Sequence, residues 1–434
     1  MLEKEDIVLQ ILEFIATVDW KKVASPGYPL QVFEITIRHF AGMISAWDLL
    51  HRPFSAMAQD ATLRQALYDQ MVALGDVLCC AFDAPSGVPR GFINPSTCEG
   101  NPDSRTSVAA VGPIILRFAR LSDITNDEKY VNLARKAESY LLWPKPSSGE
   151  PYPGLLGSCV SVNNGKIMDS GGSWGAMSDS FYEYLLKAYI YNSDEYGYYL
   201  ERWLIAVDST IANISSHPYG RPDLTFLSNW NGPGHVDHRI ESLAWFAGGN
   251  FILGGMVTGN QTLVDYGLSI ADAAGAVYQM TTTGLGGEFV SWTTTCPGFP
   301  KGETGICVFN NAIQRSDGGF RLRSEVLETW YHAYHATKDP KYTEWSWAAF
   351  EAIDRYCRTD TGFSATKDVN AEDGGGKTDT QESFVLAEVM KYVWLTQLED
   401  KNAPYHVQDG RAGIKNTWVF NTEAHPFLVA GPPV

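Results

Sequence analysis

Apolar residues recur along the chain at intervals of three and four positions, the spacing of a helix with one buried face. Every second helical segment is rich in apolar or small residues, as in "IESLAWFAGGNFILGG", whereas the segments between them carry charge, as in "NDEKYVNLARKAESYLL". The alternation predicts hairpins of one inner and one outer helix, repeated every roughly 50–75 residues. We predict twelve helices, over residues 4–18, 29–51, 60–80, 104–122, 126–143, 173–192, 195–214, 235–257, 260–280, 320–337, 340–358 and 378–397.

Long connections rich in glycine and proline separate the hairpins, for example "APSGVPRGFINPSTCEGNP" and "GLGGEFVSWTTTCPGFPKG". We expect short β-hairpins within them, and loops of this length in a compact domain usually carry function. Stacked hairpins that close into a ring form an α/α barrel, and an open helical solenoid is the alternative. No segment has the composition of an interdomain linker, so we predict a single all-α domain over residues 1–434.

Charge and composition narrow the classes of function. The 434 residues include 33 basic and 50 acidic side chains, and the net charge of −17 argues against nucleic acid or an anionic membrane surface as a partner. No run of about 18 apolar residues occurs, so we predict no transmembrane helix. The 13 Trp, 21 Tyr and 20 Phe residues suit a carbohydrate-binding protein, although a large core explains them almost as well.

The cysteines and sequons give weaker signals. Seven cysteines, at positions 79, 80, 98, 159, 296, 307 and 357, form no CxxC pair, which argues against a zinc ribbon, and their odd number leaves at least one free thiol. Two sequons, at Asn213 and Asn260, point weakly to a secretory route. The opening "MLEKEDIVLQILEF" is acidic where a signal peptide is basic, so it is not a signal peptide.

Acidic residues occur on the inner helices, where few charges are expected. Glu34 and Arg38 share an otherwise apolar face at i and i+4. A helix cap or an ordinary ion pair explains any one such acid. Acids on four inner helices instead indicate carboxylates that converge at one end of a barrel, because buried charge must be paired, hydrated or functional. The others are Asp179, Glu183, Glu325, Glu328, Glu382 and Glu388, accompanied by Arg323 and Phe384.

Two kinds of site use converging carboxylates. Glycoside hydrolysis needs an acid and a base on either side of a sugar linkage, and a hard cation needs oxygen ligands. The tail "VFNTEAHPFLV" adds a hydroxyl, a carboxylate and a histidine close to the C-terminus, framed by Val419, Phe420 and Phe427. The residues by themselves leave both kinds of site open.

Seven segments, in order along nearly the whole chain, resemble one known family. They are "FEITIRHFAGMISAWDLL", "FDAPSGVPRGFIN", "DSFYEYLLKAYIY", "FAGGNFILGG", "RSEVLETWYHAYHATKDPKY", "QESFVLAEVMKYVWL" and "VFNTEAHP". On these motifs the chain is similar to class I α-1,2-mannosidases, glycoside hydrolase family 47, and most of all to the secreted and Golgi-type enzymes of filamentous fungi. The resemblance implies an (α/α)7 toroid barrel of fourteen helices, an inverting mechanism and a bound Ca2+.

The resemblance also implies the catalytic residues. Glu34 would be the general acid, acting directly or through a water, and Asp179 would be a second acid near the scissile bond. Which of the two is the acid stays open. Glu325 would be the base that activates the attacking water, and an inverting acid and base should lie about 6.5–9.5 Å apart.

The same resemblance implies a Ca2+ site in the tail. Thr422 would bind the ion through its hydroxyl and its carbonyl oxygen, at the tip of a hairpin that rises through the barrel. Glu328, Glu388 and Glu423 would hold the waters of the ion, and the ion would bind vicinal hydroxyls of the terminal mannose.

Further substrate contacts follow from the resemblance. Phe384 would stack beneath the sugar ring, and Arg38 and Arg323 would orient the carboxylates or bind sugar hydroxyls. Glu328 and Glu388 belong to the same substrate-binding set.

The chain departs from the family pattern at several places. Twelve helices are predicted where the family has fourteen, and the first hairpin has no counterpart, so we expect an N-terminally truncated form with a gap and an exposed apolar wall. Ala110 stands where the family usually has a glutamate, Ser242 where many members have a histidine, and Ser324 replaces a proline. The common family disulfide is lost, with Trp245 and Ala274 at its positions.

We therefore expect a Ca2+-dependent enzyme that hydrolyses terminal α-1,2-linked mannose from high-mannose N-glycans of glycoproteins. A monomer that acts in the ER or Golgi, or after secretion, is expected. A catalytically weak, mannosidase-like glycan-binding protein of ER quality control is the alternative, and an unrelated α/α-barrel hydrolase or interaction solenoid is the third reading. The order of mannose removal does not follow from the sequence.

Overall fold

The structure, a computed structural model, describes residues 4–23, 25–145, 149–295, 318–398 and 415–434. Twelve helices of eight or more residues carry the fold within these ranges. The inner helices are α3 (Ala41–His51), α6 (Ile114–Thr125), α8 (Asp179–Tyr191), α10 (Phe246–Thr258), α12 (Glu325–Thr337) and α14 (Met390–Gln397). The outer helices are α1 (Glu5–Ile15), α4 (Ala61–Cys79), α7 (Lys129–Leu142), α9 (Gly197–Ser209), α11 (Gln261–Gln279) and α13 (Pro340–Cys357).

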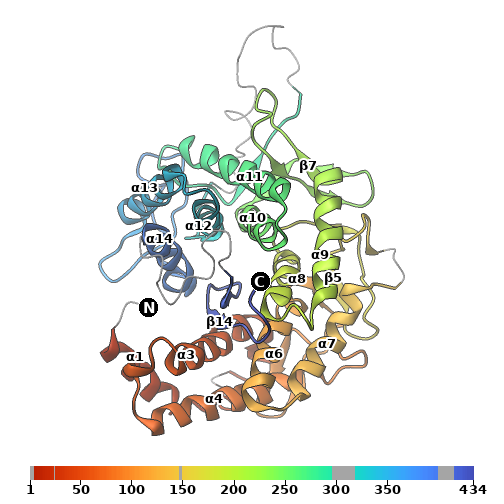
Figure 1. Ribbon diagram of the computed structural model, residues 1–434, viewed down its shortest axis with the longest axis vertical. Coiled ribbons are helices and arrows are strands. Elements are labelled where there is room, and N and C mark those ends of the chain that lie inside the picture. The colour runs from red at the N-terminus through yellow and green to blue at the C-terminus, as the bar shows by residue number, and fades with distance from the viewer. Residues whose placement is uncertain (1–3, 24, 146–148, 296–317, 399–414) are drawn as a thin grey trace.

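The inner helices surround the C-terminal hairpin. Each contacts the next inner helix along the chain, from α3 through α6, α8, α10 and α12 to α14. Figure 1 shows β14 in the middle of this arrangement, with the outer helices around it. The alternation of apolar and charged segments thus predicts the pairing of inner and outer helices correctly, and the arrangement is curved around a centre rather than an open solenoid.

Shorter helical pieces precede four of the inner helices. α2 (Val32–Ile35) and the π-helix η1 (Thr36–Phe40) lead directly into α3, and the π-helix η8 (Val385–Val389) leads into α14. π-helical turns are rare and often occur at functional sites. The remaining pieces are α5 (Val108–Val111) before α6, the π-helix η5 (Thr210–Ile214) after α9, and the 3-10 turns η2 (Ser55–Met57), η3 (Cys80–Phe82) and η6 (Ser242–Trp245).

Several inner helices begin later than the sequence pattern predicts. The predicted starts at 104, 173, 235, 320 and 378 are wrong, because strands and loops occupy the first residues of those segments. Glycines in "SGGSWG" and alternating side chains in "HVDHRIE" suit strands better than helix. The consequence is functional: irregular segments line the N-terminal ends of the inner helices.

The strands are short and antiparallel, as expected for hairpins in the connections. They group as β1 (Leu30–Gln31) with β2 (Phe92–Asn94) and β3 (Glu99–Gly100), β4 (Arg105–Ser107) with β5 (Cys159–Ser161), β6 (Gly171–Gly172) with β9 (Asn229–Asn231) and β10 (Val236–Asp237), β7 (Ser215–Ser216) with β8 (Phe226–Leu227), β11 (Arg239–Glu241) with β12 (Phe289–Ser291), and β13 (Trp418–Phe420) with β14 (Pro426–Leu428).

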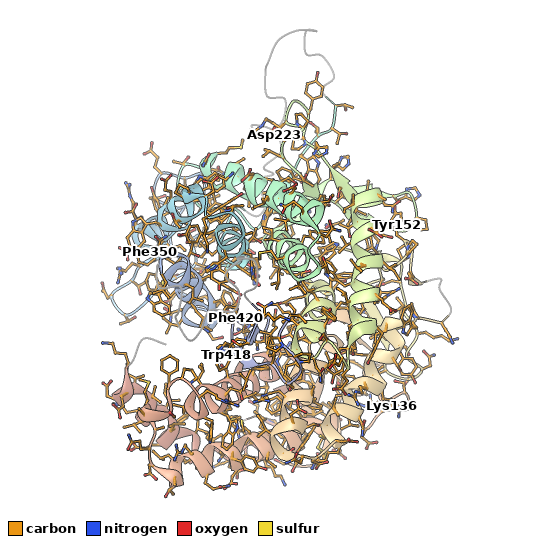
Figure 2. The ribbon with its side chains drawn as sticks, viewed as in Figure 1. Lys136, Tyr152, Asp223, Phe350, Trp418 and Phe420 are labelled. Carbon is orange, nitrogen blue, oxygen red and sulfur yellow. A yellow bond between two sulfur atoms is a disulfide. The ribbon has the colours of Figure 1, made fainter. Side chains whose placement is uncertain are left out.

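The C-terminal hairpin is buried rather than frayed. Val419 pairs with Phe427 across β13 and β14, and all three β13 residues are buried. Figure 2 shows Trp418 and Phe420 in the middle of the molecule, whereas Lys136 and Asp223 lie at its edge. The Phe420 ring contacts the rings of Tyr331 and Tyr392 on α12 and α14, with centroids 6.3 and 5.9 Å away. The hairpin therefore fills the centre of the barrel, as the tail motif predicts.

Polar contacts fix the outgoing strand of the hairpin. The Asp48 carboxylate of α3 accepts the Leu428 N–H at 2.9 Å and binds the Arg120 guanidinium of α6 through both oxygens. The Ser45 hydroxyl donates to the Pro426 carbonyl at 2.9 Å. Because these groups are buried, each bond satisfies a donor or acceptor that would otherwise be costly to leave unpaired.

The aromatic residues mostly serve the core. Five tryptophans are at most 2% exposed: Trp174, Trp203, Trp230, Trp245 and Trp330. Packing therefore accounts for these tryptophans, and they give no evidence of sugar binding.

The cysteines hold one disulfide that the sequence did not predict. Cys80 and Cys98 are bonded, with Cα atoms 5.2 Å apart. Among the described residues, Cys79, Cys159 and Cys357 are free thiols, in agreement with the expected free thiol. The cysteines at 296 and 307 lie outside the described residues.

Apolar packing occupies the place where the family disulfide is expected. Trp245 and Ala274 are both buried, and the Trp245 ring meets the Phe226 ring edge-on with centroids 5.4 Å apart. A large and a small apolar side chain are thus buried at these two positions, in η6 and α11.

The first helix keeps an exposed apolar face. Ile7, Ile11 and Phe14 of α1 are 48, 51 and 69% exposed, and Leu12 is the buried residue of the helix. No helix within the described ranges is long and apolar enough to cross a membrane.

Candidate active site

A cavity of about 440 Å³ lies at the N-terminal ends of the inner helices. Nine of the ten predicted site residues line it: Glu34, Arg38, Asp179, Arg323, Glu325, Phe384, Glu388, Thr422 and Glu423. They come from α2, η1, α8, α12, η8, the loop before α12 and the tip of the C-terminal hairpin. The arrangement of the hairpins around one centre brings these distant segments together.

Three acids stand in the first turns of three helices. Asp179 is the first residue of α8, Glu325 is the first residue of α12, and Glu34 lies within the four-residue α2. The first N–H groups of a helix have no partner inside the helix, and the helix dipole favours negative charge there. The Asp179 Oδ1 atom accepts the Ser180 N–H at 2.8 Å. The preference for acids at helix starts thus explains why each acid occurs where it does on its helix. It does not explain why all three acids line the same cavity.

Burial changes the proton affinity of two of these acids. Burial raises the pKa of Asp179 to about 8, and the nearby Glu183 carboxylate adds to the shift. Burial raises the pKa of Glu325 to about 7, while the Arg323 guanidinium opposes the shift. Within the described structure, the Glu325 Oε2 atom is buried and has no hydrogen-bond partner. An unpaired carboxylate oxygen in a cavity wall is a ready acceptor for a water proton.

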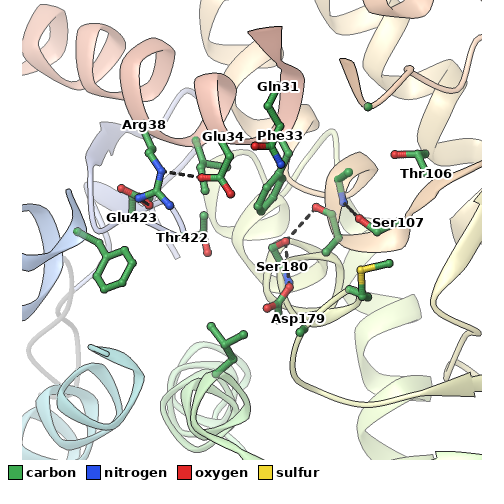
Figure 3. Close-up of a pocket in the computed structure, with 18 of the residues that line it drawn as sticks. Gln31, Phe33, Glu34, Arg38, Thr106, Ser107, Asp179, Ser180, Thr422 and Glu423 are labelled. Atoms are coloured by element: carbon green, nitrogen blue, oxygen red, sulfur yellow. Dashed lines mark hydrogen bonds and ion pairs between the residues drawn. The ribbon is translucent and has the colours of Figure 1, made fainter. Parts of the chain in front are cut away.

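Arg38 connects the first acid to the hairpin. Its Nε donates to Glu34 Oε2 at 2.7 Å, and its Nη1 donates to Glu423 Oε1 at 2.5 Å and to Ser383 Oγ at 2.8 Å. Figure 3 shows Arg38 between Glu34 and Glu423, with Thr422 beside them. The intrahelical ion pair expected at i and i+4 is therefore present, and it forms part of a larger network.

Phe384 lies close to two guanidinium groups. The guanidinium carbons of Arg38 and Arg323 are each 5.6 Å from the centroid of its ring. The ring is 7% exposed and lines the cavity. Two cations near one ring hold it in a defined plane, which suits a surface for stacking.

The tip of the C-terminal hairpin is fixed from several sides. The Tyr184 hydroxyl of α8 accepts the Thr422 N–H at 3.0 Å, and Asn421 Oδ1 accepts the N–H groups of Glu423 and His425. The Lys391 ammonium of α14 donates to the Ala424 carbonyl at 2.7 Å. These bonds direct Thr422 into the cavity.

The acids around Thr422 repel one another. Burial raises the pKa of Glu388 well above its usual value, and the carboxylates of Glu423 and Glu325 raise it further. Burial also raises the pKa of Glu423 to about 7, although Arg38 opposes the shift. This end of the cavity therefore favours a positive charge.

Glu328 is the predicted site residue that does not line the cavity. It is 7% exposed and lies 3.5 Å from the Lys187 ammonium of α8, which also pairs with Glu183. Burial raises the pKa of Glu328 to about 7, and Lys187 opposes the shift. Glu328 thus belongs to an ion-pair network in the barrel interior beside the cavity.

Two further acids border the site and were missed from the sequence. Glu288 is 6% exposed and accepts the Arg321 N–H at 3.0 Å and the Arg323 Nε–H at 3.4 Å. Glu241 accepts the Ala176 N–H at 2.6 Å. Each lies on or beside a two-stranded sheet in a connection, so helical periodicity gave no signal. A lone acid within glycine-rich "GLGGEFVS" is the signal that could have found Glu288.

The three positions at which the resemblance implies a substitution lie in or near the site. Ala110 lines the cavity, where its small side chain leaves space. Ser242 is buried, and its N–H donates to the Glu288 carbonyl at 2.8 Å. The Ser324 hydroxyl donates to Glu388 Oε2 at 2.6 Å.

Direct metal ligation by side-chain clusters is not found in the part of the chain that the structure describes. There, no group of three or more His, Cys, Asp or Glu side chains is arranged to hold a metal ion. Neither the hydroxyl nor the carbonyl oxygen of Thr422 takes part in a hydrogen bond within the described residues. Two oxygen donors of one residue, next to buried acids that can order water, are chemically suited to a hard cation.

Carboxylates that converge on one cavity are what glycoside hydrolysis requires. The sequence profile of glycosyl hydrolase family 47 matches residues 1–429, and the chain belongs to that family. The predicted family membership is thereby confirmed.

Relatives in fungi cover nearly the whole chain. A protein of Penicillium citrinum, named mannosyl-oligosaccharide alpha-1,2-mannosidase, is 44% identical over 99% of this chain and 82% of the relative. A protein of Emericella nidulans with the same name, numbered 1B, is 42% identical over 100% of this chain and 83% of the relative.

Solved structures agree with the fold. The alpha-1,2-mannosidase from Trichoderma reesei matches with a TM-score of 0.90 and 39% identity, over 98% of this chain and 87% of that chain. Cellobiose 2-epimerase from Bacillus thermoamylovorans matches with a TM-score of 0.56 at 11% identity, over 90% of this chain and 98% of that chain, which is a likeness of fold alone. The expected all-helical (α/α)7 barrel class is confirmed by the first match.

Proposed function

We propose that this glycoside hydrolase is a Ca2+-dependent α-1,2-mannosidase that removes terminal mannose from high-mannose N-glycans with inversion of configuration. The observation that carries the proposal is that Glu34, Asp179 and Glu325 line one cavity together with Thr422. The activity named for the Penicillium citrinum relative, 44% identical over 99% of this chain, supports the substrate class.

Glu325 is the proposed base. Its unpaired Oε2 atom would accept a proton from the water that attacks the anomeric carbon of the terminal mannose. Burial raises the pKa of Glu325 to about 7, which makes the carboxylate a better proton acceptor than an exposed glutamate. Backbone N–H groups of Ser324 and Glu325 hydrogen-bond to this carboxylate, which helps to hold the side chain at the start of α12.

Asp179 and Glu34 share the acid side of the reaction. Burial raises the pKa of Asp179 to about 8, so at neutral pH this group holds a proton that it can give to the leaving oxygen. Glu34 accepts a 2.7 Å hydrogen bond from the Arg38 Nε, which fixes the orientation of its carboxylate. We therefore assign proton donation to Asp179 and propose that Glu34 orients a water beside the scissile oxygen.

Thr422 is the proposed direct Ca2+ ligand, through its hydroxyl and its carbonyl oxygen. Glu328, Glu388 and Glu423 would hold the waters of the ion, with Glu328 acting from the interior beside the cavity. When bound, Ca2+ supplies a positive charge that binds vicinal hydroxyls of the terminal mannose. The crowded acids around Thr422 support this assignment, because a cation offsets their mutual repulsion.

The remaining residues would bind and orient the sugar. Phe384 offers its ring face for stacking against the mannose ring. Arg38 and Arg323 hold the phenyl ring of Phe384 in place. The space left by Ala110 lies in the same cavity, and we propose that it changes affinity or linkage preference for the sugar beyond the cleaved bond.

We also propose the setting in which the protein acts. Residues 1–434 would form one catalytic domain that works as a monomer in the secretory pathway or outside the cell. The substrate would be a high-mannose oligosaccharide, free or on a glycoprotein.

One assay tests the proposal. The chain is incubated with a nine-mannose N-glycan and Ca2+, then with a chelator, and as Glu325→Gln. We expect mannose release by the Ca2+-loaded chain, and loss of release in the other two samples. Retained glycan binding without any release would reject the enzyme and favour a mannosidase-like glycan-binding protein. Equal release with chelator would reject the Ca2+ site at Thr422.

A further inference from the structure

Ser324 lies between the base and the acid next to the hairpin tip. It precedes the first residue of α12 and is 2% exposed. Its hydroxyl donates a 2.6 Å hydrogen bond to Glu388 Oε2 on the neighbouring η8, and its carbonyl accepts the Glu328 N–H at 2.8 Å. One residue therefore contacts the turn that carries Glu325 and the carboxylate of a different inner helix.

Glu388 needs such a contact because its surroundings disfavour a negative charge. It is 7% exposed, and the nearby acids Glu423, Glu325 and Glu328 repel its carboxylate. Within the described structure, Ser324 is the residue that donates a hydrogen bond to this carboxylate. A hydroxyl that donates to a carboxylate forms a short and directional bond, so it fixes one oxygen and thereby aims the other.

We propose that Ser324 is a positioning residue of the Ca2+ site: its hydroxyl holds one oxygen of Glu388 so that the other oxygen can bind a water of the ion. This inference rests on the proposed function, because it requires Ca2+ at Thr422. It goes beyond that function because Ser324 joins the start of α12, where the base stands, to the acid that orders the water of the ion. Loss of the hydroxyl loosens the Ca2+ site without removing any carboxylate.

The contact depends on the hydroxyl of Ser324. Alanine at this position would leave the Glu388 carboxylate without this donor, whereas threonine would keep a hydroxyl there.

Ca2+ binding to three variants tests the inference without any turnover. The affinity is measured by isothermal titration of the chelator-stripped protein, and the Ca2+-induced rise in Tm is measured in parallel. Ser324→Ala removes the hydroxyl, and Ser324→Thr keeps it. The control, Ser86→Ala, removes a buried hydroxyl that donates to the Val162 carbonyl at 2.6 Å, in a loop that does not line the cavity.

We expect Ser324→Ala to weaken Ca2+ binding about tenfold, the effect of losing a hydrogen bond to a charged group. Ser324→Thr should bind within about twofold of the unmodified chain on the same reasoning. Ser86→Ala should lower Tm equally with and without Ca2+.

Unchanged Ca2+ affinity in Ser324→Ala would overturn the inference while leaving the Ca2+ site intact. Equal weakening in Ser324→Ala and Ser324→Thr would overturn it as well, because the hydroxyl would then not matter. Failure of the unmodified chain to bind Ca2+ would overturn the Ca2+ site of the proposed function together with this inference.

Discussion

Arg38 and Glu423 form an ion pair at 2.5 Å that joins the start of the barrel to the tip of its C-terminal hairpin. The same guanidinium holds Glu34 at 2.7 Å, so one side chain aligns a candidate catalytic carboxylate with the residue next to Thr422. The two halves of the proposed reaction, bond cleavage and sugar binding, thus share one positioning group.

The first prediction concerns this shared group. Arg38→Lys keeps the charge but cannot donate to Glu34, Ser383 and Glu423 in a fixed fork. We expect kcat/KM for the glycan to fall about 100-fold, because small displacements of positioned groups cost that much. The matched control is Arg221→Lys, which alters an exposed pair with Asp223 far from the cavity and should leave kcat/KM unchanged. Equal activities of the two variants would contradict the role of Arg38.

The second prediction is a pH dependence of stability that comes from Asp179. Burial raises its pKa in the folded chain to about 8, far above the value of an exposed aspartate. Between about pH 4 and pH 8 the unfolded chain has the charged form and the folded chain keeps the proton, so this group makes the fold less stable as pH rises.

Asp179→Asn removes this loss of stability with rising pH. The free energy of unfolding of the variant, measured with denaturant in chelator, should equal that of the unmodified chain near pH 4 and exceed it increasingly toward pH 8. Asp208→Asn, at an exposed position of α9, serves as the control and should give parallel curves. Parallel curves for Asp179→Asn would show that Asp179 is not held in its neutral form.

The third prediction concerns the support of the hairpin tip. Lys391→Met removes the donor to the Ala424 carbonyl and leaves that buried oxygen unpaired. We expect the free energy of unfolding to fall by about 2 kcal/mol, and the glycan activity to fall with it because Thr422 loses its fixed place. Lys136→Met, at an exposed position of α7, is the control and should change neither quantity. Full activity of Lys391→Met would refute the positioning of Thr422 by Lys391.

The fourth prediction isolates the hydroxyl of Thr422. Thr422→Val keeps the shape of the side chain but removes one of the two proposed Ca2+ ligands. The Ca2+-induced rise in Tm should shrink or disappear in this variant. Thr106→Val changes a threonine in the same cavity wall and should keep the full rise. A full rise in both variants would place the ion elsewhere.

The helices were predictable from the sequence because burial imposes a period on apolar residues. The convergence of acids such as Glu34 and Glu325 was also predictable. Buried charges must be paired, hydrated or functional, so several acids on inner helix faces indicate one common site. The family motifs supplied the roles of Thr422 and Phe384, which no period reveals. Helical pattern thus predicts the wall of the barrel, and motifs predict what faces its cavity.

Other features depend on contacts between distant segments and escaped prediction. The Cys80–Cys98 bond joins the first residue of η3, directly after α4, to the loop after β2, and spacing alone does not select that pair. The late starts of α8 and α10 depend on strand partners from other connections. Glu288 reaches the site immediately before such a strand, β12, so its place could only be found in three dimensions.

The configuration of the first released mannose tests the central claim most directly. The chain is mixed with a nine-mannose N-glycan and Ca2+, and the anomeric proton signals are followed by NMR from the first minutes. Inversion at an α-linkage, with Glu325 activating the attacking water, predicts that β-mannose appears first and then equilibrates with the α form. First appearance of α-mannose, or no mannose at all, would contradict the proposed function.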